Sequence, residues 1–398
     1  MAIPALANVF RVGPLVDLSD PDALAACGSN GRETEPCIAV NPTNQKNIVA
    51  AWFGGFSHGL VAAVSLDGGK KWQQVIVPGV TLCTGGGPFA HAFDPWLSFG
   101  PNGNLYLVCV ASIGTTFNNA VLLSKSTDGG FHWENPVALF YTEDSRQAPD
   151  KPSVTADPLD PRFVYAIWNN SANGNRGATI LSRTTDAGVS WEPARVIYDP
   201  STADSSTLGH IIRVLPDRTL VDVFSESKFS DDGTHKGALL SVIRSTDTGL
   251  TWSSPLRAAS LPIFSITDPE TGALIVNSAS GGQIPAVAMD PNNGNLYATW
   301  EDTRFSNGQY SSIAFAMSSD GGLNWSPPIP VNETPTNIPQ GNRQAFIPSI
   351  AVAADGTIGV TYYDFRFNDS NPGLPTDYWI VHCHPSSTTS PTDSVNWA

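Results

Sequence analysis

Three ionisable residues directly precede a proline at points where an apolar segment begins; the pairs are Glu35-Pro36, Asp94-Pro95 and Lys151-Pro152. His91 and Asp150 lie within three residues of these positions. Carboxyl groups, an imidazole and an ammonium group that are brought together shift one another's pKa values, which suits proton transfer. A structural interpretation is equally open, in which these residues orient the chain or pair between neighbouring units.

Further polar residues flank the same apolar segments. Those that precede such a segment are Arg32, Arg146, His210 and Arg343. Those that follow one are Asn169, Asn170, Glu226, Glu301, Asp302, Arg304, Tyr363, Asp364 and Arg366. The WEDTR stretch is close enough in sequence to form a local surface ion pair, which contributes little to stability. Tyr362 and Tyr363 must point to opposite sides of a strand, so one of them is expected in the core.

The elements that must position these residues are strands, which recur in pairs. A proline-led strand is followed by a turn and a second strand, as in EPCIAV then NIVAAW, or DPWLSF then NLYLVCV. A divergent copy, HIIRVL then TLVDVF, brings the number of pairs to six. A third strand such as LVAAVS and a fourth such as QQVIVPG complete most units. The extra residues around 262–280 predict an inserted hairpin or loop.

A second repeat, of the form SxDxGxxW, recurs with the same spacing as the strand units. Its copies are SLDGGKKW, STDGGFHW, TTDAGVSW, STDTGLTW and SSDGGLNW, whose aspartates recur roughly every 60 to 70 residues. The aspartate is suited to accept hydrogen bonds from N–H groups of its own turn. The glycine two residues later can take a positive φ, and the tryptophan can bury an apolar face between units. These residues are therefore predicted to be scaffold rather than catalytic.

Six units of four strands predict an all-β six-bladed β-propeller of four-stranded antiparallel blades. The sixth unit ends near Trp397 without a fourth strand, and the segment NVFRVGPLVDL at residues 8–18 has no partner of its own. We expect this N-terminal strand to close the ring, because an open ring would expose strand edges. A missing further blade is the alternative. The repeat spans nearly the whole chain, so residues 1–398 are expected to form one domain.

Composition and charge limit the classes of partner that this protein is expected to bind. Charged residues make up only 14% of the 398, against about 25% in ordinary globular proteins, and the chain has 35 Gly and 32 Pro. The net charge of −15 argues against nucleic acid and anionic membranes as partners. The sequence contains no apolar run near the ~20 residues of a membrane-spanning helix. Oligomeric state stays open.

The five cysteines leave at least one thiol unpaired. Cys37 and Cys109 fall within apolar strands and are expected as buried thiols, whereas Cys27 and Cys83 lie in loops and could form a disulfide. The N-terminus has no secretory signal, so the protein is either cytosolic or secreted with its signal removed, and the extracellular composition favours secretion. No cofactor is expected; structural calcium is an option near Asp231-Asp232 or Asn368-Asp369, although neither has a complete ligand spacing.

The SxDxGxxW repeats in step with six strand pairs resemble the sialidase superfamily, whose Asp boxes have this form, over almost the whole chain. The resemblance implies an active site on the face opposite the boxes, where inner strands begin and second strands end. It also implies a tyrosine nucleophile, an activating glutamate, an aspartate acid and arginines that grip a substrate carboxylate. Tyr363, Glu226 and Asp94 match the first three roles, and the expected substrate is a terminal, acidic sugar of a glycan.

The arginines match the resemblance less well. No arginine stands where sialidases have an Arg-Ile-Pro motif, although several cations lie near the same rim: Arg32, Arg304, Arg343 and Arg366. One alternative is a lyase on a uronic-acid polysaccharide, with His91 or His210 as base and Arg343, Arg32 or Lys151 as the neutralising cation. Another alternative is a propeller that binds a glycan or a protein without turnover, because fold alone does not fix function.

Overall fold

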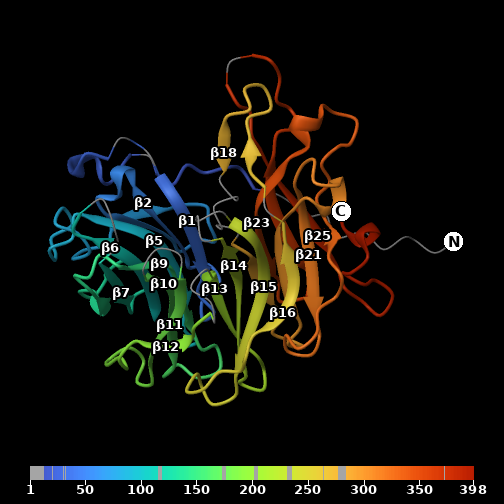
Figure 1. The fold of residues 1–398 in the computed structure, drawn as a ribbon. Coiled ribbons are helices and arrows are strands. Elements are labelled where there is room, and N and C mark those ends of the chain that lie inside the picture. Colours follow the sequence, from blue (N-terminus) through green and yellow to red (C-terminus); the bar gives the residue numbers. More distant parts are fainter. Residues whose placement is uncertain are drawn as a thin grey trace.

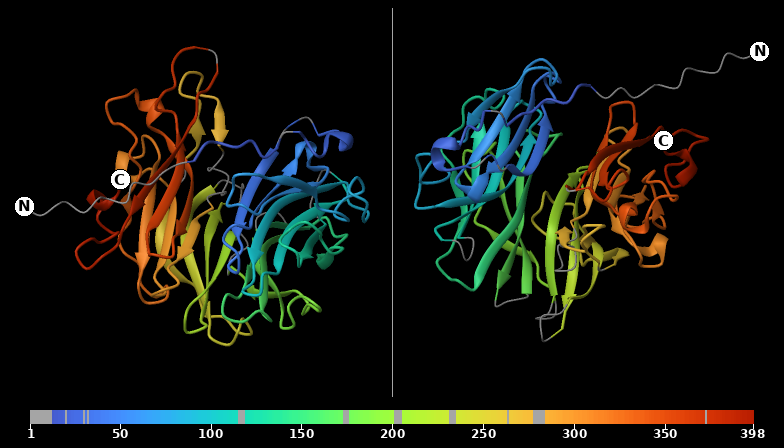
Figure 2. Two further views of the ribbon diagram at one scale, coloured as in Figure 1. Left: turned by 180° about the vertical axis from the view of Figure 1, so that it is seen from behind. Right: turned by 90° about the horizontal axis from the view of Figure 1, so that it is seen from above.

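The computed structural model describes residues 13–19, 21–29, 31, 33–114, 119–172, 176–200, 205–230, 235–262, 264–276, 284–371 and 373–398. This part of the chain is all-β apart from five short 3₁₀ helices: η1 (Ala25–Cys27), η2 (Gly55–Ser57), η3 (Arg304–Ser306), η4 (Gln340–Arg343) and η5 (Ser394–Asn396). Small antiparallel sheets follow one another around a common centre in a propeller-like arrangement, from blue β1 to the red C-terminal strands (Figures 1 and 2).

The first two sheets each have four strands in sequence order. Their strands are β1 (Glu33–Val40), β2 (Ile48–Gly54), β3 (Leu60–Ser65) and β4 (Gln73–Ile76), then β5 (His91–Phe99), β6 (Leu105–Ser112), β7 (Ala120–Ser126) and β8 (Val137–Tyr141). Each strand pairs antiparallel with the next one along the chain. The predicted order of inner, second, third and outer strand is confirmed here.

The next two units share one eight-stranded sheet. Their strands are β9 (Gln147–Ala156), β10 (Val164–Ala172), β11 (Arg176–Thr184), β12 (Arg195–Tyr198), β13 (Ser205–Val214), β14 (Leu220–Phe229), β15 (His235–Ser245) and β16 (Leu256–Leu261). A single parallel contact, Gly177 with Ser206, joins the two units. A side chain at Gly177 would clash, because its Cβ would lie 2.2 Å from Ser206 Oγ. Glycine therefore permits the close approach that merges the units.

The last units are more irregular. Their strands are β19 (Ala286–Met289), β20 (Leu296–Asp302), β21 (Ser312–Ser318) and β22 (Ile329–Pro330), then β23 (Ala345–Val352), β24 (Ile358–Asp364) and β25 (Asp377–Cys383). Between the fourth and fifth units the predicted insertion is confirmed as a hairpin of β17 (Ile266–Thr267) and β18 (Leu274–Val276). Six separate four-stranded sheets are not found: the described residues form three, together with the eight-stranded sheet and a three-stranded sheet.

Closure of the ring is not established. Residues 1–12, which hold most of the expected closing strand, lie outside the described residues, and residues 13–18 form no strand. At the outer edge of β25, the backbone of His382 instead exchanges two hydrogen bonds with Ala398. The preceding Trp397 is buried and packs edge-on against Phe315. The C-terminal residues thus occupy part of the position that a fourth strand would take.

The core is divided among the interfaces between successive sheets. One apolar cluster joins β2 and β3 to β5–β7, and similar clusters join each later unit to the next. Because each strand alternates its side chains between two neighbours, a unit cannot bury both faces alone. Within the described part of the chain, no helix is long and apolar enough to cross a membrane.

The repeated turns have the predicted scaffold geometry. In the first, Asp67 Oδ1 accepts hydrogen bonds from the N–H groups of Lys70 and Lys71 at 3.0 and 2.9 Å. Gly69 has a φ of 87°, and Trp72 Nε1 donates to its carbonyl at 2.8 Å. The other four turns repeat the aspartate-to-backbone bonds. The aspartates are thus committed to their own turns.

Candidate functional site

The inner strands share a repeated irregularity at the centre of the molecule. Each of five inner strands is interrupted near its start by a register shift; these strands are β1, β5, β9, β13 and β23. The residue at that point has a left-handed backbone: φ is 54° at Glu35, 53° at Asp94, 43° at Lys151, 69° at Gly209 and 50° at Ile347. Non-glycine residues in this conformation, particularly before proline, cost about 1–3 kcal/mol each and often mark functional sites.

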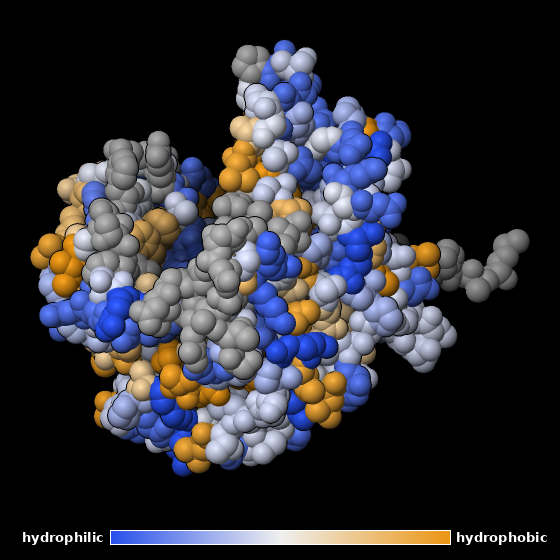
Figure 3. All heavy atoms as spheres, viewed as in Figure 1, coloured by the Kyte–Doolittle hydropathy of each residue, from blue (hydrophilic) through white to orange (hydrophobic). Residues whose placement is uncertain are grey.

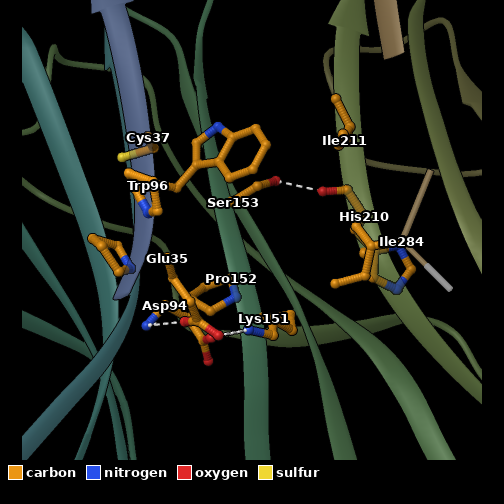
Figure 4. A pocket seen from close by; sticks show the side chains of 13 residues that line it. Glu35, Cys37, Asp94, Trp96, Lys151, Pro152, Ser153, His210, Ile211 and Ile284 are labelled. Carbon is orange, nitrogen blue, oxygen red and sulfur yellow. Dashed lines mark hydrogen bonds and ion pairs between the residues drawn. The ribbon is translucent and has the colours of Figure 1, made fainter. Parts of the chain in front are cut away.

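These bulges bring Glu35, Asp94 and Lys151 together, although 116 residues separate the first from the last (Figure 4). Lys151 Nζ contacts Glu35 Oε1 and Asp94 Oδ1 at the same time. Glu35 Oε2 also accepts a hydrogen bond from the Asp94 N–H at 3.1 Å. The side chains of Glu35, Lys151 and Asp94 are 35%, 29% and 8% exposed, so the cluster is open to solvent at one side.

The cluster divides its carboxyl groups into two protonation classes. Burial, together with hydrogen bonding to Asp94, raises the pKa of Glu35 to about 8. Burial and the charge of Asp94 raise the pKa of Asp150 to about 7. Burial would also raise the pKa of Asp94, but hydrogen bonding from Glu35 and the charge of Lys151 outweigh it and hold that pKa below its ordinary value. Near neutral pH, Glu35 thus carries a proton beside the ionised Asp94.

A cavity of about 150 Å³ adjoins this cluster. The charged residues line one end, and residues further along the strands line the rest, including Cys37, Trp96 and Ile211 (Figure 4). Ile284 contributes another apolar wall. Burial raises the pKa of the Cys37 thiol to about 12, so this group is a neutral part of the lining. The arrangement sets proton-transfer groups at one end of a largely apolar cavity.

The predicted arginines are mostly engaged elsewhere. Arg304 pairs with the buried Asp302, and Arg366 donates hydrogen bonds from Nε and Nη2 to the buried Asp364. Arg366 also lies 3.5 Å from the centre of the Trp379 ring. Arg343 Nε donates to the Ile338 carbonyl at 2.9 Å. Arg32 lies outside the described residues. Hence the structure does not assemble the expected arginine grip from the three arginines that it describes.

Glu226 does not meet Tyr363. Glu226 is buried between the third and fourth units, where it accepts hydrogen bonds from Tyr198, Ser241 and Arg257 at 3.2, 3.1 and 3.0 Å. Tyr363 belongs to β24 in the last unit, where it stacks on Phe346 and packs at a tilt against Tyr378. Its neighbour Tyr362 is fully buried, as predicted for one of the pair. The tyrosine that contacts Glu226 is therefore Tyr198, which no sequence pattern had singled out.

The two histidines differ in their surroundings. His210 is 1% exposed; its Nδ1 lies 2.8 Å from Asp222 Oδ2, and its Nε2 lies 3.3 Å from Thr179 Oγ1. Both ring nitrogens are thus engaged inside the protein. His91 Nδ1 lies 3.1 Å from Ser57 Oγ, and its ring stacks on His58 and Phe93. Only His91 is half-exposed, so a base for elimination would have to be this residue.

No cluster of three or more His, Cys, Asp or Glu side chains that could hold a metal ion occurs in the described part of the chain. The possible calcium residues Asp231 and Asp232 lie outside it. At the other position, Asp369 accepts hydrogen bonds from the backbone and side chain of Asn371. Calcium binding stays a prediction without a complete ligand set.

Two functional candidates were missed or undervalued by sequence reasoning. Glu35 was grouped with the ionisable residues before prolines but received no specific catalytic assignment, although it precedes a proline as Asp94 and Lys151 do. Trp96, two residues after Asp94, carried no signal because an apolar residue in a strand is ordinarily core. The predicted disulfide between Cys27 and Cys83 is confirmed, and Cys109 is a buried thiol as expected.

Neither a protein-family model nor a curated protein sequence matches this chain. Solved structures do share its fold. A protein of unknown function from Dyadobacter fermentans matches with a TM-score of 0.56 at 14% identity, over 88% of this chain and 93% of that one. The Penicillium chrysogenum α-L-arabinanase complexed with arabinobiose gives 0.56 at 16%, over 84% and 89%. A Hadza microbial sialidase gives 0.52 at 14%, over 85% and 64%.

At these identities the likeness extends to the fold alone. The structures that share this fold include sialidases, an α-L-arabinanase and an α-L-arabinofuranosidase. Proteins of one fold carry out different reactions, so the chemistry has to be argued from the site.

Proposed function

We propose that this protein is a glycoside hydrolase in which Glu35 is the general acid and Asp94 the catalytic carboxylate. The observation that carries this proposal is the contact of one ammonium, Lys151, with both carboxyl groups. It stabilises the charge of Asp94 while burial keeps the proton on Glu35. One protonated and one ionised carboxyl group are the two groups that most glycosidases require.

The close spacing of the two groups favours retention of configuration. Inverting enzymes hold their carboxyl groups ~6.5–9.5 Å apart to admit a water, whereas retaining enzymes hold them ~5–5.5 Å apart. Glu35 Oε1 and Asp94 Oδ1 both contact Lys151 Nζ, so these two carboxyl groups have the close spacing of retaining enzymes. In this scheme Asp94 attacks the anomeric carbon while Glu35 protonates the departing oxygen. Water then attacks the glycosyl ester, Glu35 takes the water's proton, and Asp94 leaves as a carboxylate.

For the substrate we propose a neutral terminal sugar in place of the acidic sugar first expected. The charge of Lys151 is offset by the ionised Asp94, and the neighbouring Glu35 and Asp150 add no positive charge, so the cluster offers an anionic ligand no uncompensated cation. Arg304 and Arg366 are already paired with buried aspartates. Because arabinobiose is bound in similar structures, arabinosides are the first neutral substrates to test.

The test is a panel of arabinosides, sialosides and uronic-acid polysaccharides, in which reducing ends and absorbance near 235 nm are followed together. Hydrolysis of a neutral glycoside, with the retained anomer seen first by proton NMR, would support the proposal. An inverted first product would exclude the nucleophilic role of Asp94. Rising absorbance would indicate elimination and direct attention to His91. If neither signal appears with any substrate, the protein is a binding propeller.

We further propose that residues 1–398 form one domain, a closed ring of six units. The successive interfaces between units and the incomplete three-stranded sheet support this closure. A secreted location is also proposed, because the disulfide between Cys27 and Cys83 would persist in an oxidising compartment.

A further inference from the structure

A second cavity, of about 230 Å³, lies beneath the inserted hairpin. Three segments line it: residues 264–267 at the start of the hairpin, residues 303–311 after β20, and residues 340–344 before β23. Because β20 is a second strand and β23 an inner strand, this rim pocket belongs to the same face as the charged cluster. The hairpin projects from that face, and Figure 3 shows apolar surface on the projecting part. Its strand β18 exposes Leu274 and Ile275.

The hairpin is fastened over the rim pocket by one buried side chain. Gln344 Oε1 accepts a hydrogen bond from the Thr267 N–H at 2.9 Å, and its Nε2 donates to the Thr267 carbonyl at 2.8 Å. Beneath this link, Ile266 packs with Phe346 and Phe365 in a small apolar cluster. Gly341 also approaches the hairpin closely, because a Cβ there would lie 3.1 Å from Pro269. The rim pocket is therefore a built feature.

The lining of the rim pocket is polar but uncharged. It carries hydroxyl groups, side-chain amides and two aromatic rings, and no acidic or basic residue; the lining residues besides Gln344 are Phe264, Ser265, Thr267, Thr303, Gly308, Gln309, Tyr310, Ser311, Gln340 and Gly341. Gln344 and Ser311 use their polar atoms within the protein. Gln309 and Gln340 are exposed and present amide groups that both donate and accept hydrogen bonds.

Tyr310 gives the rim pocket an aromatic wall of fixed orientation. The Arg343 guanidinium lies 5.7 Å from the centre of the Tyr310 ring and is itself held by the Ile338 carbonyl. An aromatic ring beside donor and acceptor groups suits a sugar, whose C–H face packs on the ring while its hydroxyls meet the amides. A charged ligand would be desolvated here without a counter-charge among the lining residues.

We propose that the rim pocket binds one neutral sugar unit of a glycan, as a site separate from the charged cluster. Its volume is below the ~300–1,000 Å³ of pockets for drug-sized ligands, which matches a single ring better than a long chain. Binding here would hold a glycan against the face that carries Glu35 and Asp94. The site would serve a hydrolase and a binding propeller alike.

The test is calorimetric titration of the full-length protein with neutral oligosaccharides, namely arabinobiose, xylobiose and cellobiose, beside sialyllactose and a glucuronide. At least one neutral oligosaccharide should bind, and Tyr310→Ala should weaken that binding about tenfold. Gln340→Ala, at an exposed position, should weaken it less. Tyr141→Ala is the matched control, because Tyr141 is also a half-exposed aromatic residue but lies on outer strand β8.

Binding that survives Tyr310→Ala and Gln340→Ala, or tighter binding of the acidic ligands, would overturn the proposal, as would failure of every neutral oligosaccharide to bind. Repeating the titration with Glu35→Gln separates the two sites. If that variant, and not Tyr310→Ala, loses the ligand, the sugar binds at the charged cluster and the rim pocket is excluded. If no substrate is hydrolysed but Tyr310-dependent binding remains, the hydrolase proposal fails and this one stands.

Discussion

Two glutamates of this protein, Glu35 and Glu226, lie in clusters that differ in backbone geometry and in exposure to solvent. In the charged cluster, Glu35 and Asp94 both contact Lys151, and all three residues lie on inner-strand bulges with left-handed backbones. In the interblade cluster, Glu226 lies on regular strand β14 and accepts hydrogen bonds from Tyr198, Ser241 and Arg257. The Glu35 side chain is 35% exposed, whereas that of Glu226 is 4% exposed.

The difference supports the proposal that the Glu35 cluster is reactive and that Glu226 has a structural role. Glu226 has its oxygens satisfied by three donors, so a substrate would have to displace an existing partner. Glu35 has fewer partners, a pKa raised to about 8 and an open side toward solvent. Backbone strain that persists in three neighbouring strands is costly unless the site needs it. We therefore propose that catalysis takes place at the charged cluster and that the interblade cluster stabilises the fold.

The largest expected effect comes from removing the proton donor. Glu35→Gln should lower the rate of glycoside hydrolysis by about 10²–10⁴, the usual contribution of a general acid, while the thermal midpoint changes little. Glu33→Gln is the matched control, because Glu33 is an exposed carboxyl group on the same strand. Near-normal hydrolysis by Glu35→Gln would refute the assignment.

Breaking the interblade cluster should affect stability instead. Glu226→Ala leaves Arg257 and Ser241 without their acceptor, and should lower the free energy of unfolding by about 3 kcal/mol, as measured by urea denaturation. The folded variant should keep its activity. Asp144→Ala, which removes the exposed ion pair with Arg146, is the control and should lower stability far less. If a Glu226 variant had normal stability but no activity, Glu226 would again be assigned a catalytic role.

The pH dependence of stability should sharpen the contrast further. Burial raises the pKa of Glu35 to about 8 from an ordinary 4.5, so the folded protein holds this proton more tightly than the unfolded chain. Its stabilising contribution is complete below about pH 4.5 and is lost as the pH rises through about 8. Glu35→Gln should therefore make the decline over this range shallower, by less than one proton because the group is partly exposed. Denaturation curves at several pH values would measure this slope, and an unchanged slope would contradict the raised pKa.

The smallest effect is expected at the tyrosine first assigned as nucleophile. Tyr363→Phe should alter the hydrolysis rate by about twofold or less, because Tyr363 packs on Phe346 and Tyr378 and does not reach Glu226. Tyr198→Phe, which removes a hydrogen bond to Glu226, should act through stability. Loss of all activity in Tyr363→Phe would favour a tyrosine nucleophile over Asp94.

Much of the scaffold was readable from the sequence because its signals are local. The turn aspartates, the glycines with positive φ and the inserted hairpin follow from short patterns, and each is confirmed. The disulfide joins cysteines 56 residues apart; the sequence offered it as an option for Cys27 and Cys83, and the structure contains it. The candidate site was only partly readable. Asp94, Lys151 and Asp150 were selected by their place before an inner strand, but the pairing of Glu226 with Tyr363 was wrong. Which residues face one another depends on strand register and on the faces turned toward each neighbour.

The sequence by itself thus determined the strand repeats, the turn chemistry and the residues that stand at the start of each inner strand, because hydrophobic periodicity and turn preferences act over a few residues. Only the tertiary structure decided that Lys151 would contact Glu35 and Asp94, that Arg304 and Arg366 would be paired with aspartates, and that a hairpin would cover the rim pocket. These contacts join residues far apart in the chain, so they depend on how the units pack around a common centre and on the bulges that turn each side chain inward.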